Sequence, residues 1–239
     1  MKKRKAALLL PVRSVIFLLI FVAGSAITGK ALGSISNWWS VTATIVNLFT
    51  VLLIVLYARK TGTTYRSMIN YQRGKTTLRE IVKVSLIILL VGIGCMYIAG
   101  LICYQKFPYT APMMIAPIPK WLAVINIPLL PVTTALAEEG LYLGCGVNQI
   151  KNRNCAIIVP ALFFALQHSF IPTLPDAKYM IYRFISFLPL TLILCRYYHR
   201  KRDPLPIMIG HALIDAATVM QILATSMIPG FYDKMCKLS

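Results

Sequence analysis

The stretch that decides the fold is residues 82–104, VKVSLIILLVGIGCMYIAGLICY, in which Lys83 is the only charged residue. A helix needs about 20 mostly apolar residues to cross the ~30 Å hydrocarbon core of a bilayer, and this stretch is long enough. Six further apolar windows predict spans of the same kind: about 12 to 28, 38 to 57, 123 to 146, 155 to 172, 181 to 198 and 205 to 228. The sequence therefore predicts an all-α, polytopic transmembrane helical bundle of about seven spans.

The composition of the whole chain agrees with insertion into a membrane. Of its 239 residues, 58% are hydrophobic and only 13% are charged, and the mean hydropathy is +0.71. Soluble domains are nearer about 45–50% apolar, with about a quarter of residues charged. Because the spans leave no room for a soluble domain, we expect residues 1–239 to form a single integral-membrane domain. A re-entrant piece within the proline-rich stretch 108–119 would raise the number of spans to eight.

The basic residues are distributed as the positive-inside rule requires. The net charge is +18, and 18 of the 25 Lys and Arg residues, Arg13 among them, fall on the cytoplasmic side if the N-terminus is cytoplasmic. This excess therefore indicates topology, and we expect no nucleic-acid partner. Lys2 to Lys5 and the small residues at 23–26 are also typical of a signal peptide. The first apolar run is long enough to span, however, so we expect a signal anchor.

Five ionisable residues fall inside the predicted spans, where each charge costs about 2.5–3.5 kcal/mol on insertion scales and is a functional hypothesis by default. They are Glu138 and Glu139 in the fourth span, His168 in the fifth, and His211 and Asp215 in the seventh. Residues four apart share a helix face, whereas adjacent residues point about 100° apart. His211 and Asp215 are thus expected to act together, and only one of the two glutamates is expected to be primary.

The depth of the glutamates depends on two prolines. Pro128 and Pro131 make the start of the fourth window a poor continuous helix. We therefore expect the regular helix to start near Pro131, which brings Glu138 toward the middle of the bilayer.

A carboxylate and an imidazole that share one water can activate it as a nucleophile, while further donors stabilise the oxyanion that forms on an attacked carbonyl. This inventory favours an intramembrane peptidase. The same residue types also serve proton relays in transporters, and polar groups in a membrane also bond helices together. A zinc site on His168, His211 and Glu138 is a further alternative, although no H-E-x-x-H motif is present.

The order and spacing of these residues resemble the E-E-x-x-x-R, F-x-x-x-H and H-x-x-x-N/D motifs of the CPBP family, which comprises type II CAAX prenyl endopeptidases and bacteriocin-processing or immunity proteins. The matching residues are Glu138-Glu139-Gly-Leu-Tyr-Leu-Gly, Phe164-x-x-x-His168 and His211-x-x-x-Asp215. The resemblance places a protease-like core at residues 121–228.

The resemblance implies a glutamate-type endopeptidase with no cofactor. Glu138 and His168 would activate water, and His211 and Asp215 would stabilise the oxyanion. Glu139, Phe164 and Tyr142 would support them. The implied substrate is a membrane-associated peptide or a prenylated, CAAX-like protein, and membrane lipids are the other partner. The expected location is the plasma membrane, as a multi-pass protein. A non-catalytic immunity or scaffold protein of the same fold is the alternative.

The chain departs from the family pattern at one position, because the motif arginine falls at Leu143. Without that cation, Glu139 must be protonated, pair with Tyr142 or a residue of another helix, or reach a water-filled cavity. The departure favours weakened catalysis or binding without catalysis as an alternative outcome.

Overall fold

The computed structural model describes residues 2–238, with side chains from Ala6 to Lys237. Lys2 to Lys5, assigned above to the cytoplasmic side, lie outside the described side chains. Every regular element in the described range is helical. The α-helices are α1 (Val12–Thr28), α2 (Leu32–Ser36), α3 (Trp39–Lys60), α4 (Tyr65–Met68), α5 (Leu78–Tyr104), α6 (Lys120–Glu138), α7 (Arg153–His168), α8 (Ala177–Lys201), α9 (Leu205–Met227) and α10 (Phe231–Leu238). The other elements are the 3₁₀ turns η1 (Lys2–Leu9) and η2 (Pro112–Ile115) and the π-helix η3 (Glu139–Val147).

Six of these helices are long and apolar enough to cross a membrane: Ala6–Thr28, Trp39–Lys60, Leu78–Tyr104, Lys120–Val147, Ala177–Lys201 and Leu205–Met227. They make this a multi-pass membrane protein. The predicted all-α class is confirmed. The described residues contain six helices that are long and apolar enough to span, whereas about seven were predicted and eight were an alternative. The difference is α7, which has 16 residues and is about 24 Å long, short of a ~30 Å hydrocarbon core.

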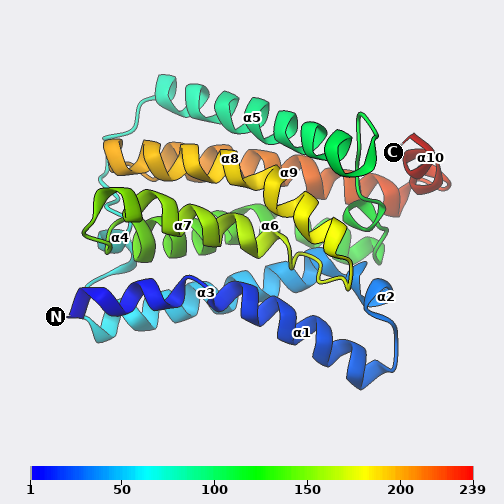
Figure 1. Ribbon diagram of the computed structural model, residues 1–239, viewed down its shortest axis with the longest axis horizontal. Helices are drawn as coiled ribbons and strands as arrows, with labels where there is room; N and C mark the ends of the chain where they lie inside the picture. The colour runs from blue at the N-terminus through cyan, green and yellow to red at the C-terminus, as the bar shows by residue number, and fades with distance from the viewer. Residues whose placement is uncertain (1, 239) are drawn as a thin grey trace.

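The long helices lie side by side, and α7 keeps the alternation of direction that seven crossings require (Figure 1). The N-terminus, α4 and the starts of α5, α7 and α9 gather at one end, whereas α2 and the C-terminus lie at the other. Helices α6 to α9 pack against one another in the pairs α6–α9 and α7–α8. Helix α5 covers one side of this group, and α1 and α3 cover the other. The helices that carry the predicted site residues are therefore the interior ones.

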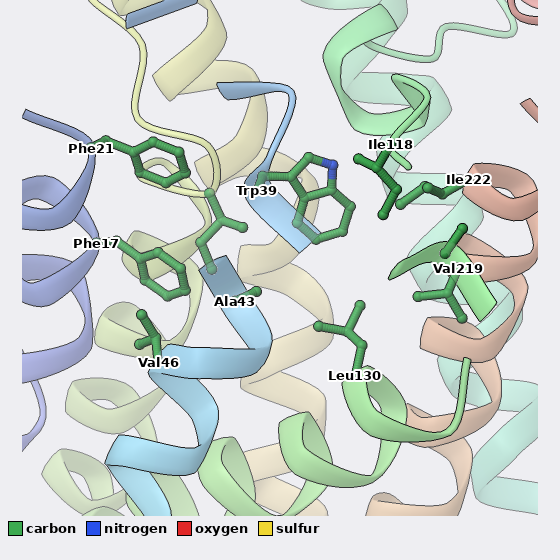
Figure 2. Close-up of a cluster of buried hydrophobic side chains, with 11 residues drawn as sticks. Phe17, Phe21, Trp39, Ala43, Val46, Ile118, Leu130, Val219 and Ile222 are labelled. Carbon is green, nitrogen blue, oxygen red and sulfur yellow. The ribbon is translucent and has the colours of Figure 1, made fainter. Parts of the chain in front are cut away.

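The apolar core fixes α1 against the rest of the bundle. Figure 2 shows Phe17 and Phe21 of α1 pointing toward Ala43 and Val46 of α3, with Trp39 beyond them. The two phenylalanines are fully buried, and burying a side chain of this size contributes about 1.5–3 kcal/mol. Helix α1 is thus an integral part of the fold.

The segment that carries the two glutamates does not follow the prediction. The regular helix does not start near Pro131: α6 begins at Lys120 and contains both Pro128 and Pro131. Membrane helices tolerate such prolines, because neighbouring groups and local adjustments satisfy the freed backbone carbonyls. At Glu139 the chain then changes to the π-helix η3, whose residues are all buried. Single π turns within helices are frequent at functional sites.

Candidate active site

A cavity of about 240 Å³ lies within the bundle. Its wall includes all four predicted catalytic side chains, from α6, α7 and α9, together with Phe164: Glu138, His168, His211 and Asp215. The supporting residues Glu139 and Tyr142 are buried but do not line it. The four predicted catalytic residues therefore line one cavity, whereas two of the supporting residues are buried outside its wall.

Glu138 is held by a cation from the first helix. Arg13, which is 1% exposed, donates from Nη2 to Glu138 Oε1 at 2.9 Å. The same guanidinium donates from Nε to Gln167 Oε1 at 2.6 Å and from Nη1 to Asn47 Oδ1 at 2.8 Å. Arg13, counted above among the basic residues of the cytoplasmic side, is therefore not a solvated surface residue. Its position at the start of an apolar run places it inside the bundle, where a carboxylate compensates its charge.

The other carboxylate oxygen of Glu138, Oε2, is not held by Arg13. Glu138 Oε2 is buried and forms no hydrogen bond with a described residue, and it lies 3.8 Å from Nε2 of His211. That separation is too long for a direct hydrogen bond. The arginine thus fixes the carboxylate through one oxygen, and the second forms no hydrogen bond with a described residue.

Glu139 is paired by His211. The distance from His211 Nδ1 to Glu139 Oε1 is 2.8 Å, and the side chain of Glu139 is fully buried. Of the four fates open to Glu139 from sequence, the structure selects pairing with another helix. Because Nδ1 is engaged in this way, Nε2 of His211 is directed toward Glu138 Oε2 and toward Asp215 Oδ2, 3.9 Å away. Asp215 Oδ2 has no hydrogen-bond partner among the described residues.

His168 lies one helical turn from Phe164. Its Nδ1 is 2.9 Å from the carbonyl oxygen of Phe164, so Nδ1 carries the proton and Nε2 is left as an acceptor. The His168 ring stacks on Phe187 with centroids 3.6 Å apart. Within the described side chains, His168 forms no ion pair with Glu138, and the Phe164 ring lies 6.1 Å from each of the two histidine rings. Glu138 and His168 therefore face the same cavity without touching.

Tyr142 supports the site from behind rather than pairing with Glu139. Its ring stacks on Phe164 at 4.5 Å, and its hydroxyl donates to Gln167 Oε1 at 3.0 Å. Gln167 thus joins Tyr142 to Arg13. Leu143, at the position of the motif arginine, packs in an apolar cluster with Val84, Leu194 and Tyr198. The motif position is filled by core packing, and the cation of this site comes from α1.

The zinc alternative finds no ligand set. Across the part of the chain that the structure describes, no group of three His, Cys, Asp or Glu side chains is arranged to hold a metal ion. His168, His211 and Glu138 do not form such a group among the described residues.

Sequence reasoning missed the two buried arginines, Arg13 and Arg183, which both line the cavity. Both fall inside predicted spans, 12 to 28 and 181 to 198. The rule that flags ionisable residues within spans would have found them, but it was applied only to acids and histidines. Gln167 and Asn47 were missed for a different reason: amides in apolar windows carry no comparable signal.

Comparison with known proteins bears on the same helices. A family model described as Rce1-like, type II CAAX prenyl endopeptidase, matches residues 120–217. No curated protein and no solved structure matches the chain. The matched segment runs from the start of α6 past Asp215 and so contains every predicted site residue. Residues 120–217 are therefore similar to the Rce1-like type II CAAX prenyl endopeptidase family.

Proposed function

We propose that this protein is an intramembrane, glutamate-type endopeptidase that cleaves a membrane-associated peptide or a CAAX-like protein. The observation that carries the proposal is Glu138, a residue of the cavity wall: Arg13 holds one carboxylate oxygen at 2.9 Å, and the other forms no hydrogen bond with a described residue. Similarity to a peptidase family implies a peptide or protein substrate.

In the proposed mechanism, Glu138 Oε2 accepts a proton from a water molecule as the water oxygen attacks the peptide carbonyl carbon. Nε2 of His168 accepts a hydrogen bond from the same water and orients it. Developing negative charge on the carbonyl oxygen is stabilised by donors placed in advance. When Nε2 of His211 carries a proton it is such a donor, and Asp215 and Glu139 hold that ring in place. Glu138 then passes its proton to the leaving amine.

The first helix supports the view that catalysis is retained without the motif arginine. Arg13 supplies a buried cation to Glu138, and His211 supplies a partner to Glu139. The two carboxylates are therefore both compensated. For the same reason we treat residues 1–239 as a single membrane domain, with the protease-like core at 121–228 depending on α1. The short loops and the size favour a bacterial plasma membrane, with the N-terminus in the cytoplasm.

The proposal is tested with purified protein in detergent and a CAAX-like peptide as substrate. The peptide carries a prenylated cysteine, two aliphatic residues and a terminal residue. Loss of a general acid–base group lowers rates by about 10²–10⁴-fold, so Glu138→Gln and His168→Ala should lower kcat by this factor. Glu80→Gln, at a surface ion pair with Lys201, is the control and should cleave normally. Equal cleavage by Glu138→Gln and the unchanged protein would sink the peptidase assignment and favour the scaffold alternative.

A chelator arm tests the absence of a cofactor. We expect the rate to be unaffected by chelator. Loss of activity with chelator and its recovery with zinc would overturn that expectation.

A further inference from the structure

Arg183 of α8 is a buried cation on the cavity wall that the proposed mechanism does not use. It is 3% exposed, and among the described residues no Asp or Glu forms an ion pair with it. Its only hydrogen bond to a described residue runs from Nε to the carbonyl oxygen of His168 at 3.4 Å. Its side chain is part of the cavity wall, and its terminal nitrogens form no hydrogen bond with a described residue.

This arrangement differs from that of the other buried arginine. Arg13 has a carboxylate, two amide oxygens and a hydroxyl around it, which compensate its burial. Arg183 instead lies over the face of Phe187, with the guanidinium carbon 4.8 Å from the ring centroid. A buried charge is costly unless it is paired. The pairing that Arg13 has within the protein is left at Arg183 for a ligand.

We propose that Arg183 is the residue that binds the free C-terminal carboxylate of the peptide substrate, an assignment that rests on the proposed peptidase function. A guanidinium presents two parallel N–H donors that match the two oxygens of a carboxylate. His168 stacks on one ring, Phe187, that Arg183 also contacts. An extended chain rises about 3.3 Å per residue. A short terminal segment of the substrate can therefore extend from a scissile bond near His168 to Arg183.

The size of the cavity favours a chain end over an internal segment. Its volume of about 240 Å³ is below the ~300–1,000 Å³ of ordinary ligand pockets. A few terminal residues fit such a space more readily than a chain that enters and leaves. Arg183 therefore sets how far the terminus extends beyond the scissile bond.

The test compares three versions of one prenylated peptide: the free acid, the C-terminal amide, and the amide with glutamate as its last residue. Hydrogen bonds to charged groups contribute enough for about a 10- to 100-fold preference, so the unchanged protein should cleave the free acid faster than the plain amide by that factor in kcat/KM. Arg183→Gln should remove the preference, so that its kcat/KM is the same for the free acid and for the plain amide. Arg183→Lys should keep part of the preference, because lysine keeps the positive charge but lacks the two parallel N–H donors of the guanidinium.

Arg196→Gln is the matched control, because Arg196 is an exposed arginine on the same helix. It should retain the full preference. Equal cleavage of acid and amide by the unchanged protein, or the same ratio in Arg183→Gln, would overturn the proposal. Full recovery of cleavage with the glutamate-ended amide would also overturn it, because a side-chain carboxylate would then be the ligand.

A binding measurement separates this proposal from the peptidase assignment. Fluorescence anisotropy with the labelled acid and amide reports recognition even when nothing is cleaved. Preferential binding of the acid that is lost in Arg183→Gln, without cleavage, would support the carboxylate site and reject the peptidase function. Equal binding of acid and amide would reject the carboxylate site.

Discussion

At the scale of single residues, the pair of Arg13 and Glu138 is the contact on which the site depends. Both side chains are almost completely buried, and Arg13 Nη2 lies 2.9 Å from Glu138 Oε1. A buried ion pair adds little stability compared with an apolar pair, but removing one partner leaves an uncompensated charge and costs about 3–5 kcal/mol. The pair therefore fixes the position of Glu138 more than it stabilises the fold.

Arg13→Gln should destabilise the protein by about 3–5 kcal/mol, and the double variant Arg13→Gln/Glu138→Gln should recover much of this loss, because both charges are gone. Unfolding in detergent, followed by circular dichroism, measures both. Arg59→Gln, at an exposed position on α3, is the control and should change stability by no more than about 0.5 kcal/mol. A double variant less stable than Arg13→Gln would contradict the account of a charge left unpaired.

Which site residues the sequence predicts depends on the type of residue. Acids and histidines within apolar windows indicate a functional site, and Glu138, His168, His211 and Asp215 do line one cavity. Basic residues were counted as topology signals, and so Arg13 and Arg183 were missed. The pairing of Glu139 with His211 joins residues 72 positions apart. No local pattern in the sequence encodes such a contact.

At the scale of elements, η3 explains why the motif position could not be interpreted from spacing. The pairing of residues four apart holds for an α-helix, but Glu139–Val147 is a π-helix, with the Asn148 amide donating to the carbonyl of Leu143. Leu143 consequently packs against α5 and α8 residues in the core. The same limit applies to α6, where tertiary packing keeps two prolines inside one helix.

Leu143→Arg should therefore fail to restore the family motif. The new guanidinium would be buried among Val84, Leu194 and Tyr198, so we expect a loss of about 3–5 kcal/mol in stability and no gain in peptide cleavage. Leu143→Met is the control, and a swap of this kind usually costs less than about 1.5 kcal/mol. Higher activity in Leu143→Arg would show that Arg13 does not replace the motif cation.

The close packing of η3 on α7 gives a second prediction for this element. A Cβ on Gly146 would lie 2.8 Å from two ring carbons of Pro160, and a proline ring within a helix cannot rotate away. Gly146→Ala should cost about 1–3 kcal/mol as an overpacked core, measured as a lower thermal unfolding midpoint in detergent. Gly94→Ala in α5 meets nothing within 4 Å, and it should be neutral or slightly stabilising. Similar midpoints for the two variants would mean that η3 and α7 are not packed this closely.

At the scale of the whole molecule, the alternation of the helices brings the basic segments together. The segment after α3, the start of α7 and the segment after α8 lie at the end of the bundle that carries the N-terminus (Figure 1). Residues 59–83, 151–153 and 196–202, which include these segments and the adjoining helix ends, supply 13 of the 18 basic residues of the predicted cytoplasmic set. The hydropathy pattern was sufficient to predict this alternation. It could not show that α7 has only 16 helical residues, because an apolar run continues past His168 while the helix ends there.

Two native cysteines can report the orientation of the bundle. Cys155 is exposed at the start of α7, at the end that carries the N-terminus, and Cys236 lies in α10 at the opposite end. With a cytoplasmic N-terminus, as the positive-inside rule requires, a membrane-impermeant maleimide should label Cys236 in intact bacterial cells and Cys155 only in inverted vesicles. Cys155→Ser and Cys236→Ser identify each signal by its loss. Labelling of Cys155 from outside intact cells would reverse the orientation and, with it, the side of the membrane on which the basic end lies.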